Sequence, residues 1–206
     1  SDRAIARDSM PIHSLLATGA LHHHLIRQGL RIDANIVVET ASARDSHQIA
    51  CLLGFGATAI YPYLAYSVLD ELIRDGEVLG EPSACYKNYR KGINKGLLKI
   101  MSKMGISAVS SYRGAQLFEA VGLSRVVVDK VFCGVASRIQ GCGFAELEQD
   151  QKILASRAWS ARKGIEQGGL LKYVHGQEYH AFNPDVVMTL QQAVASGDYA
   201  VYQRYS

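Results

Sequence analysis

A strand, a helix and a second strand follow one another between residues 35 and 61, and this order constrains the fold more than any other feature. The run NIVVET at 35–40 is apolar, β-branched and of strand length. Ser46 is expected to cap the helix that follows, and Gly54 to end it. The apolar face of that helix is made of Ile49, Leu52 and Leu53. With a second strand at 57–61, the segment predicts a parallel βαβ unit and an α/β fold class.

Residues 54–59 read GFGATA and match the GxGxxA fingerprint of dinucleotide-binding turns. That turn must leave a strand and open a helix, because the free N–H groups of the helix N-terminus hold the pyrophosphate. Here the glycines close a helix and lead into a strand. We therefore interpret the segment as a helix-to-strand turn and expect no saturable binding of NAD(P)H.

Functional groups in parallel folds gather at the carboxyl ends of the strands. In this sequence those ends are Glu39-Thr40 and Tyr61-Pro62-Tyr63. The alternative, which we favour, is that they are buried strand ends without a chemical role.

The remaining elements are expected from periodicity and from glycine and proline positions. Helices are expected at 12–27, 64–74, 85–104, 115–121, 145–162 and 184–195, with an amphipathic stretch at 126–131. A strand is expected at 106–112, a linker at 75–84, a loop at 138–144 and an irregular tail from 168. Three strands are too few to close a barrel, so the fold expected is an incomplete or degenerate (β/α) barrel with a helix-rich segment.

Composition excludes several classes of protein. The 206 residues are 48% hydrophobic and 20% charged, and no run is long and apolar enough to span a membrane. No signal peptide is visible and the first residue is not methionine, so we expect a cytoplasmic location and a piece of a longer chain. The four cysteines are expected to be reduced thiols, and a net charge of +3 is too small to imply a nucleic acid.

Lysines recur every fourth residue along the helix expected at 85–104. They are Lys87, Lys91, Lys95, Lys99 and Lys103, opposite an apolar stripe of Ile93, Leu97, Ile100 and Met104. Two interpretations stay open, a contact with a polyanion and an ordinary solvated helix face, and we favour the second.

Histidines invite a metal interpretation at two places. His22, His23 and His24 point about 100° apart on a helix and cannot converge on one ion. His175 and His180, with Glu178 between them in HGQEYH, form a more plausible trio, but a hydrogen-bonded loop is favoured over a metal site. The sequence shows no GxSxG, no phosphate-binding loop and no Cys–His nucleophile pair.

Three long blocks, at 33–66, 91–123 and 168–199, closely resemble the glutamate synthase large (alpha) chain, most of all its bacterial NADPH-dependent type. The resemblance implies a parent with an N-terminal glutamine amidotransferase domain and a central α/β domain like a degenerate barrel. It also implies an FMN-binding synthase domain with a 3Fe-4S cluster, and a C-terminal β-helix. The parent would make two L-glutamate from L-glutamine and 2-oxoglutarate with NADPH electrons.

By the same resemblance, residues 1–80 would end the central domain and residues 81–206 would lead into the synthase domain. The implied partners are the remaining domains and the NADPH-binding small (beta) subunit. Cys133 and Cys142 do not match the cluster spacing, so no catalytic, cofactor-binding or metal-binding residue is carried over. We expect neither FMN nor 3Fe-4S on this stretch, and self-association through apolar faces left uncovered, such as the stripe ending at Met104. The alternative is an independent, non-enzymatic binding module that uses the lysine stripe or the HGQEYH loop.

Overall fold

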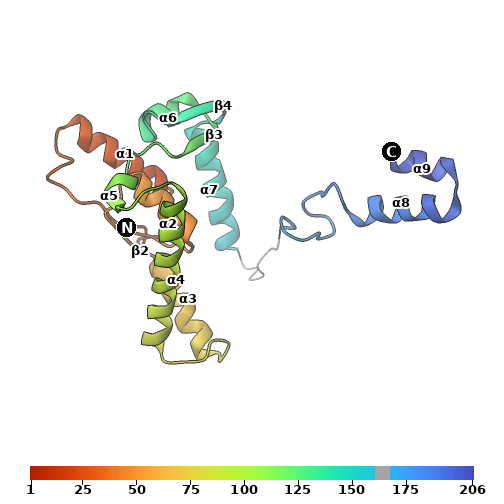
Figure 1. Ribbon diagram of the computed structural model, residues 1–206, viewed down its shortest axis with the longest axis horizontal. Coiled ribbons are helices and arrows are strands. Elements are labelled where there is room, and N and C mark those ends of the chain that lie inside the picture. The colour runs from red at the N-terminus through yellow and green to blue at the C-terminus, as the bar shows by residue number, and fades with distance from the viewer. Residues whose placement is uncertain (161–167) are drawn as a thin grey trace. The chain divides into compact units, whose positions relative to one another are not determined.

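The computed structural model describes residues 1–160 and 168–206, which form two compact units, 1–159 and 160–206. Figure 1 shows the order of the elements along the chain. The helices of the first unit are α1 (Ser14–Arg27), α2 (Ser46–Gly54), α3 (Tyr63–Arg74), α4 (Pro82–Lys103), α5 (Val109–Tyr112), α6 (Arg125–Val131) and α7 (Phe144–Ala158). Its strands are β1 (Val37–Glu39), β2 (Ala59–Tyr61), β3 (Glu119–Leu123) and β4 (Ala136–Cys142). The second unit holds α8 (Pro184–Ser196) and α9 (Tyr199–Tyr205).

The expected βαβ unit is confirmed. Strands β1 and β2 pair in parallel with Val38 opposite Ile60, and α2 makes the crossover between them. The cap is one residue earlier than expected, because the side chain of Asp45 accepts the N–H of Gln48 at 2.8 Å. Ser46 is therefore the first helical residue, and not the cap.

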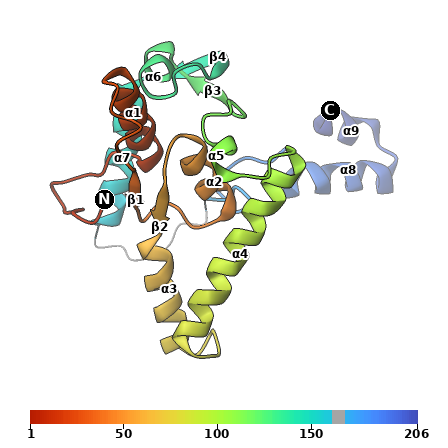
Figure 2. The same ribbon diagram turned by 60° about the vertical axis from the view of Figure 1, so that its left-hand side comes forward.

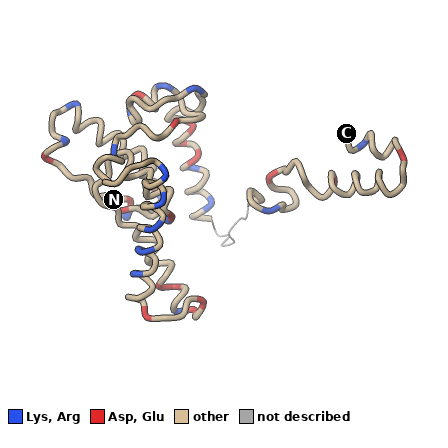
Figure 3. The backbone as a smooth tube through the Cα atoms, viewed as in Figure 1, with Lys and Arg blue, Asp and Glu red and all other residues tan. Residues whose placement is uncertain are grey.

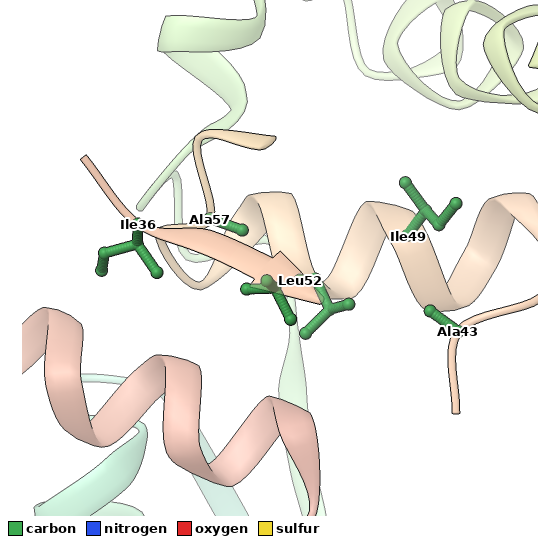
Figure 4. Packing of buried hydrophobic residues seen from close by; sticks show 6 residues of the cluster. Ile36, Ala43, Ile49, Leu52 and Ala57 are labelled. Atoms are coloured by element: carbon green, nitrogen blue, oxygen red, sulfur yellow. The ribbon is translucent and has the colours of Figure 1, made fainter. Parts of the chain in front are cut away.

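The main apolar core lies between this unit and its neighbours. Figure 4 shows members of this core, with Ile49 and Leu52 on α2 and Ile36, Ala43 and Ala57 on the loops beside β1 and α2. The buried members are Ile36, Val38, Ala43, Ile49, Leu52 and Ala57. From α4, Ile93 and Leu97 pack against this cluster.

Between residues 106 and 142 three expected elements were wrong, whereas the amphipathic stretch expected at 126–131 corresponds to α6. The run at 106–112 contains the short helix α5 and no strand, because Tyr112 is buried with Ala50 and Met101 and so turns inward. Residues 115–121 form no helix, and β3 begins there at Glu119. The expected loop at 138–144 is mostly strand β4, which pairs in parallel with β3. Pairing with a partner strand decides such weak local signals.

The second pair of strands repeats the βαβ arrangement on a smaller scale. Helix α6 connects β3 to β4 and buries Val127, Val128 and Val131. The structure therefore has a mixed α/β fold, and no closed barrel forms within residues 1–160 and 168–206.

Helices α3 and α4 form a hairpin that extends away from the strands, as Figures 1 and 2 show. The segment 75–84, expected as a linker, supplies the hairpin loop and the first turn of α4. The expected exposure of the apolar stripe on α4 was wrong for Ile93, Leu97 and Ile100, which pack against core clusters, whereas Met104 is 43% exposed.

The second unit is helical only from residue 184 onward in its described part. Asn183 caps α8 through its side chain, and Gly197 ends it in the left-handed conformation. The terminal helix α9 was not expected. The expected helix over 145–162 corresponds to α7, and its last two residues, 161 and 162, lie outside the described residues. Among the helices of the described ranges, none has the length and apolar character needed to cross a membrane.

Candidate functional site

The carboxyl ends of β1 and β2 carry a cluster of polar side chains, and the N-terminal residues lie against it. The carboxylate of Asp2 accepts the hydroxyl of Thr40 at 2.6 Å and the N–H of Ala41 at 3.1 Å. Its own N–H donates to the carbonyl of Glu39 at 3.2 Å. Thr40 is fully buried. Residues 1–3 thus continue the strand ends and cover them.

A second layer of the cluster surrounds Glu39. Its carboxylate accepts the hydroxyl of Ser1 at 2.6 Å and forms an ion pair with Arg3. The Arg3 guanidinium lies 4.5 Å from the ring centre of Tyr63 and 5.7 Å from that of Tyr61. The arginine is therefore held by one carboxylate and two aromatic rings.

The electrostatics of the cluster follow from these contacts. The Ser1 hydroxyl, and then Arg3, hold the pKa of Glu39 below its ordinary value. Burial, and then the hydrogen bond with Asp2, raise the pKa of Tyr63. Both groups are thereby kept in the charge states they ordinarily have near pH 7, and neither is poised to exchange a proton there.

The polar groups of this cluster find their hydrogen-bond partners within the chain. Asp2, Glu39 and Thr40 each have partners supplied by the chain itself. The sequence pointed to Glu39, Thr40, Tyr61 and Tyr63 through their place at strand ends, but it gave no signal for residues 1–3. Their contacts span 36 to 39 residues of sequence, and no local pattern encodes such a distance.

The glycine turn at 54–59 joins α2 to β2, as the sequence predicts. A side chain at Gly54 would meet the ring of Phe118 at 2.5 Å. Gly56 has φ +113°, and a side chain there would meet the ring of His22 at 2.4 Å. Close packing within the chain thus accounts for both glycines, and the lack of NAD(P)H binding stays a prediction.

His22 is an internal anchor. Its Nδ1 accepts the Nε–H of Arg31 at 2.9 Å, and Arg31 also donates to the carbonyls of Ala34 and Gly56. Burial, and then the neighbouring His23, Arg31 and Arg113, lower the pKa of His22 to about 4. The ring is neutral near pH 7, and its Nδ1 is engaged by an N–H donor.

The HGQEYH loop lies in the second unit. The ring of His180 is hydrogen-bonded to the carbonyl of Gly169, and Tyr173 contacts His175 at 3.3 Å. The backbone N–H of Glu178 donates to Gly168 at 3.3 Å. The favoured interpretation, a hydrogen-bonded loop, is confirmed for His180.

One Cys–His pair was missed by the sequence analysis. The Sγ of Cys51 lies 3.7 Å from Nε2 of His47, one turn apart on α2. Their spacing of four residues on a helix was the available signal. Burial, and then Asp45, raise the pKa of Cys51, so the thiol stays protonated and is a poor nucleophile.

The cysteines of the chain are the residues that an iron–sulfur cluster would need as ligands. All four cysteines are free thiols, with Cys51 and Cys85 partly buried and Cys133 and Cys142 exposed. Within the described ranges, no three His, Cys, Asp or Glu side chains gather closely enough to hold a metal ion. These residues do not fit a cluster.

Two surface features of the first unit lie outside the sites described so far. The five lysines of α4 are all exposed, and Figure 3 shows the positive charge following that helix. An apolar groove of about 710 Å³ lies between α1, α6 and α7, lined among others by Ile12, Phe132, Phe144 and Leu154.

Comparison with known proteins decides the family. Residues 1–124 match the family model described as the glutamate synthase central domain. The chain belongs to the glutamate synthase family. It is 42% identical to the glutamate synthase [NADPH] large chain of Bacillus subtilis over 208 residues. This aligned stretch covers all of this chain and 14% of that relative.

Other glutamate synthases match the same stretch. Ferredoxin-dependent glutamate synthase 1 of Arabidopsis thaliana is 42% identical over 217 residues, which is 97% of this chain and 13% of the relative. Glutamate synthase [NADH] of Schizosaccharomyces pombe is 39% identical over 214 residues, all of this chain and 10% of the relative. The chain therefore spans 10% to 14% of the length of these relatives and is a segment of a glutamate synthase.

Proposed function

We propose that this glutamate synthase segment is a scaffold and domain interface rather than the catalytic centre. The parent enzyme would make two L-glutamate from L-glutamine and 2-oxoglutarate, with NADPH electrons that pass through FMN and a 3Fe-4S cluster. The observation that carries the proposal is the strand-end cluster. Parallel folds place catalytic groups there, and in this chain residues 1–3 close that end with hydrogen bonds and an ion pair.

The chemistry of the cluster supports a structural role. A catalytic group needs a face open to substrate and a pKa matched to its task. The Thr40 hydroxyl is fully buried and already bonded to Asp2 and Ser42. Glu39 is held by Ser1 and Arg3. These groups serve to join the N-terminal residues to the sheet.

The cofactors of the proposed parent would be held by other segments. FMN would accept and pass electrons there, and the cluster would relay them. The four cysteines of this chain are free thiols, and we propose that the cluster ligands lie in other segments. The boundary proposed near residue 80, the cytoplasmic location, and the contacts with the remaining domains and the NADPH-binding small subunit are parts of the same proposal.

The test is to assay the purified 206-residue chain alone. We expect a colourless preparation that forms no glutamate from glutamine, 2-oxoglutarate and NADPH, with the full-length enzyme as the positive control. A flavin spectrum or glutamate formation by the chain alone would refute the proposal.

A further inference from the structure

The cationic face of α4 has features that the fold of this chain does not explain. The helix carries Arg90 and five lysines, and its 22 residues include no aspartate or glutamate. The lysines are spaced four residues apart, so each repels the next along the helix. In helix α7, by contrast, a lysine is paired with an acidic residue one turn away, since Lys152 lies 2.6 Å from Glu148. In the described part of the chain, no lysine of α4 forms an ion pair.

The lysines share one broad face. At about 100° per residue, the positions from Lys87 to Lys103 sweep about 160° of the helix surface. The other residues within this sector are Asn88, Gly92, Leu98 and Ser102, and all of them are exposed. Figure 3 shows Lys and Arg positions following α4 and Asp and Glu positions at the loop end of the hairpin, so the two signs of charge are separated along the hairpin.

Gly92 provides a second, independent observation. Glycine inside a helix is unfavourable, and it needs a reason in packing. Gly96 has one, because a side chain there would meet the Ser46 hydroxyl at 2.0 Å. A side chain at Gly92 would meet nothing within 4 Å among the described atoms. Because Gly92 has no side chain, the backbone of another protein surface can approach the exposed cationic face closely at this position.

Leu98 favours a protein surface over a nucleic acid as the partner of the lysine face. It is 66% exposed within the lysine face and offers an apolar contact in the middle of the charges. The aromatic residues of α4 do not lie on this face, since Tyr86 and Tyr89 pack edge-on against Tyr66 of α3. A stacking platform for nucleic acid bases is therefore missing there.

We propose that this face of α4, defined by its five lysines with Gly92 and Leu98, docks an acidic protein surface elsewhere in the glutamate synthase assembly. The partner surface presents aspartate and glutamate side chains around a small apolar contact for Leu98. The inference rests on the proposed role as a domain interface and assigns that role to a particular surface. Complementary charge sets the orientation of the two surfaces and makes the contact sensitive to salt.

The experiment is zero-length carbodiimide cross-linking of a complete glutamate synthase that contains this chain, followed by peptide mass spectrometry. The reagent joins a lysine amine to a carboxylate in direct contact. We expect links from the α4 lysines to acidic peptides outside residues 1–206, reduced about tenfold in 0.5 M NaCl. The link between Lys152 and Glu148 serves as the internal control, because it lies within one helix.

Two triple variants separate charge from structure. In K91E/K95E/K99E the remaining links from Lys87 and Lys103 should fall about tenfold, whereas in K91R/K95R/K99R they should persist. Both variants of the complete enzyme should retain the wild-type melting temperature, which excludes unfolding as the cause. Links confined to residues 1–206, or an absence of α4 links, would each overturn the proposal. These outcomes are independent of whether the isolated chain forms glutamate.

Discussion

Two glycines with opposite surroundings give the sharpest test at the scale of single residues. Gly56 has φ +113° and lies against His22, whereas Gly92 sits inside α4 with open space around it. We expect Gly56→Ala to lower the free energy of unfolding by roughly 2–4 kcal/mol through strain and overpacking. Gly92→Ala should raise it by about 0.5–1 kcal/mol through helix propensity. Urea unfolding of the two variants checks both signs, and equal effects would contradict the account.

His22 makes stability depend on pH. In the folded chain its pKa is about 4, whereas in the unfolded chain it is near 6.5. Between these values the unfolded chain binds more protons, so stability is present above pH 6.5 and is lost as pH falls toward 4. After allowance for solvent screening at this partly exposed site, the loss by pH 4.5 is roughly 1–2 kcal/mol.

The variant His22→Asn tests this source of pH dependence. The amide oxygen can still accept from Arg31, but it does not titrate, so the fall in unfolding free energy between pH 7 and 4.5 should become smaller. It should not vanish, because burial also lowers the pKa values of His13 and His23. Urea titrations at four pH values are sufficient. An unchanged slope would show that His22 does not contribute.

At the scale of elements, the sequence predicted what periodicity and caps encode. The βαβ unit of β1, α2 and β2 was found within two residues at each boundary. Helices α1, α3 and α4 were also found, because each has a continuous apolar face. The lysine stripe was placed correctly on an exposed side of α4, but the apolar stripe of the same helix was also expected to be exposed. Whether Ile93 and Leu97 are covered depends on a core formed by distant residues.

The elements between 106 and 142 could not be read in the same way. The sequence of β3 contains Glu119 and Gly122 and gives little strand signal, yet it pairs with β4. Conversely, α5 is built from residues typical of strands and is fixed by the burial of Tyr112. In both cases tertiary contacts override local preference. The contacts of Asp2 and Arg3 with the strand ends are also tertiary, and for that reason the local sequence pattern did not reveal them.

At the scale of the whole molecule, the apolar groove between α1, α6 and α7 replaces the α4 stripe as the reason to expect self-association. Ile12 is 71% exposed and Leu154 57% exposed along this groove. We expect the isolated chain to be oligomeric by light scattering. Ile12→Glu with Leu154→Glu should shift it toward monomer. Val194, in the second unit, is 77% exposed and serves as the control position. Val194→Glu should leave the distribution of oligomeric states unchanged. A monodisperse wild-type monomer with one sharp thermal transition would favour an independent module.

The central claim is that this segment supports the enzyme and performs none of its chemistry. The most direct measurement is glutamate synthesis by the full-length enzyme with Glu39→Gln or Thr40→Val, alongside unfolding of the isolated variant chains. Each substitution weakens the contacts that tie residues 1–3 to the sheet. For the buried Thr40 the unfolding free energy should fall by about 1–2 kcal/mol, and for the partly exposed Glu39 we expect a smaller fall. We expect kcat and KM of both full-length variants to stay within about twofold of wild type. A fall in kcat of more than about tenfold, with unchanged stability, would contradict it and place the strand ends in the catalytic machinery.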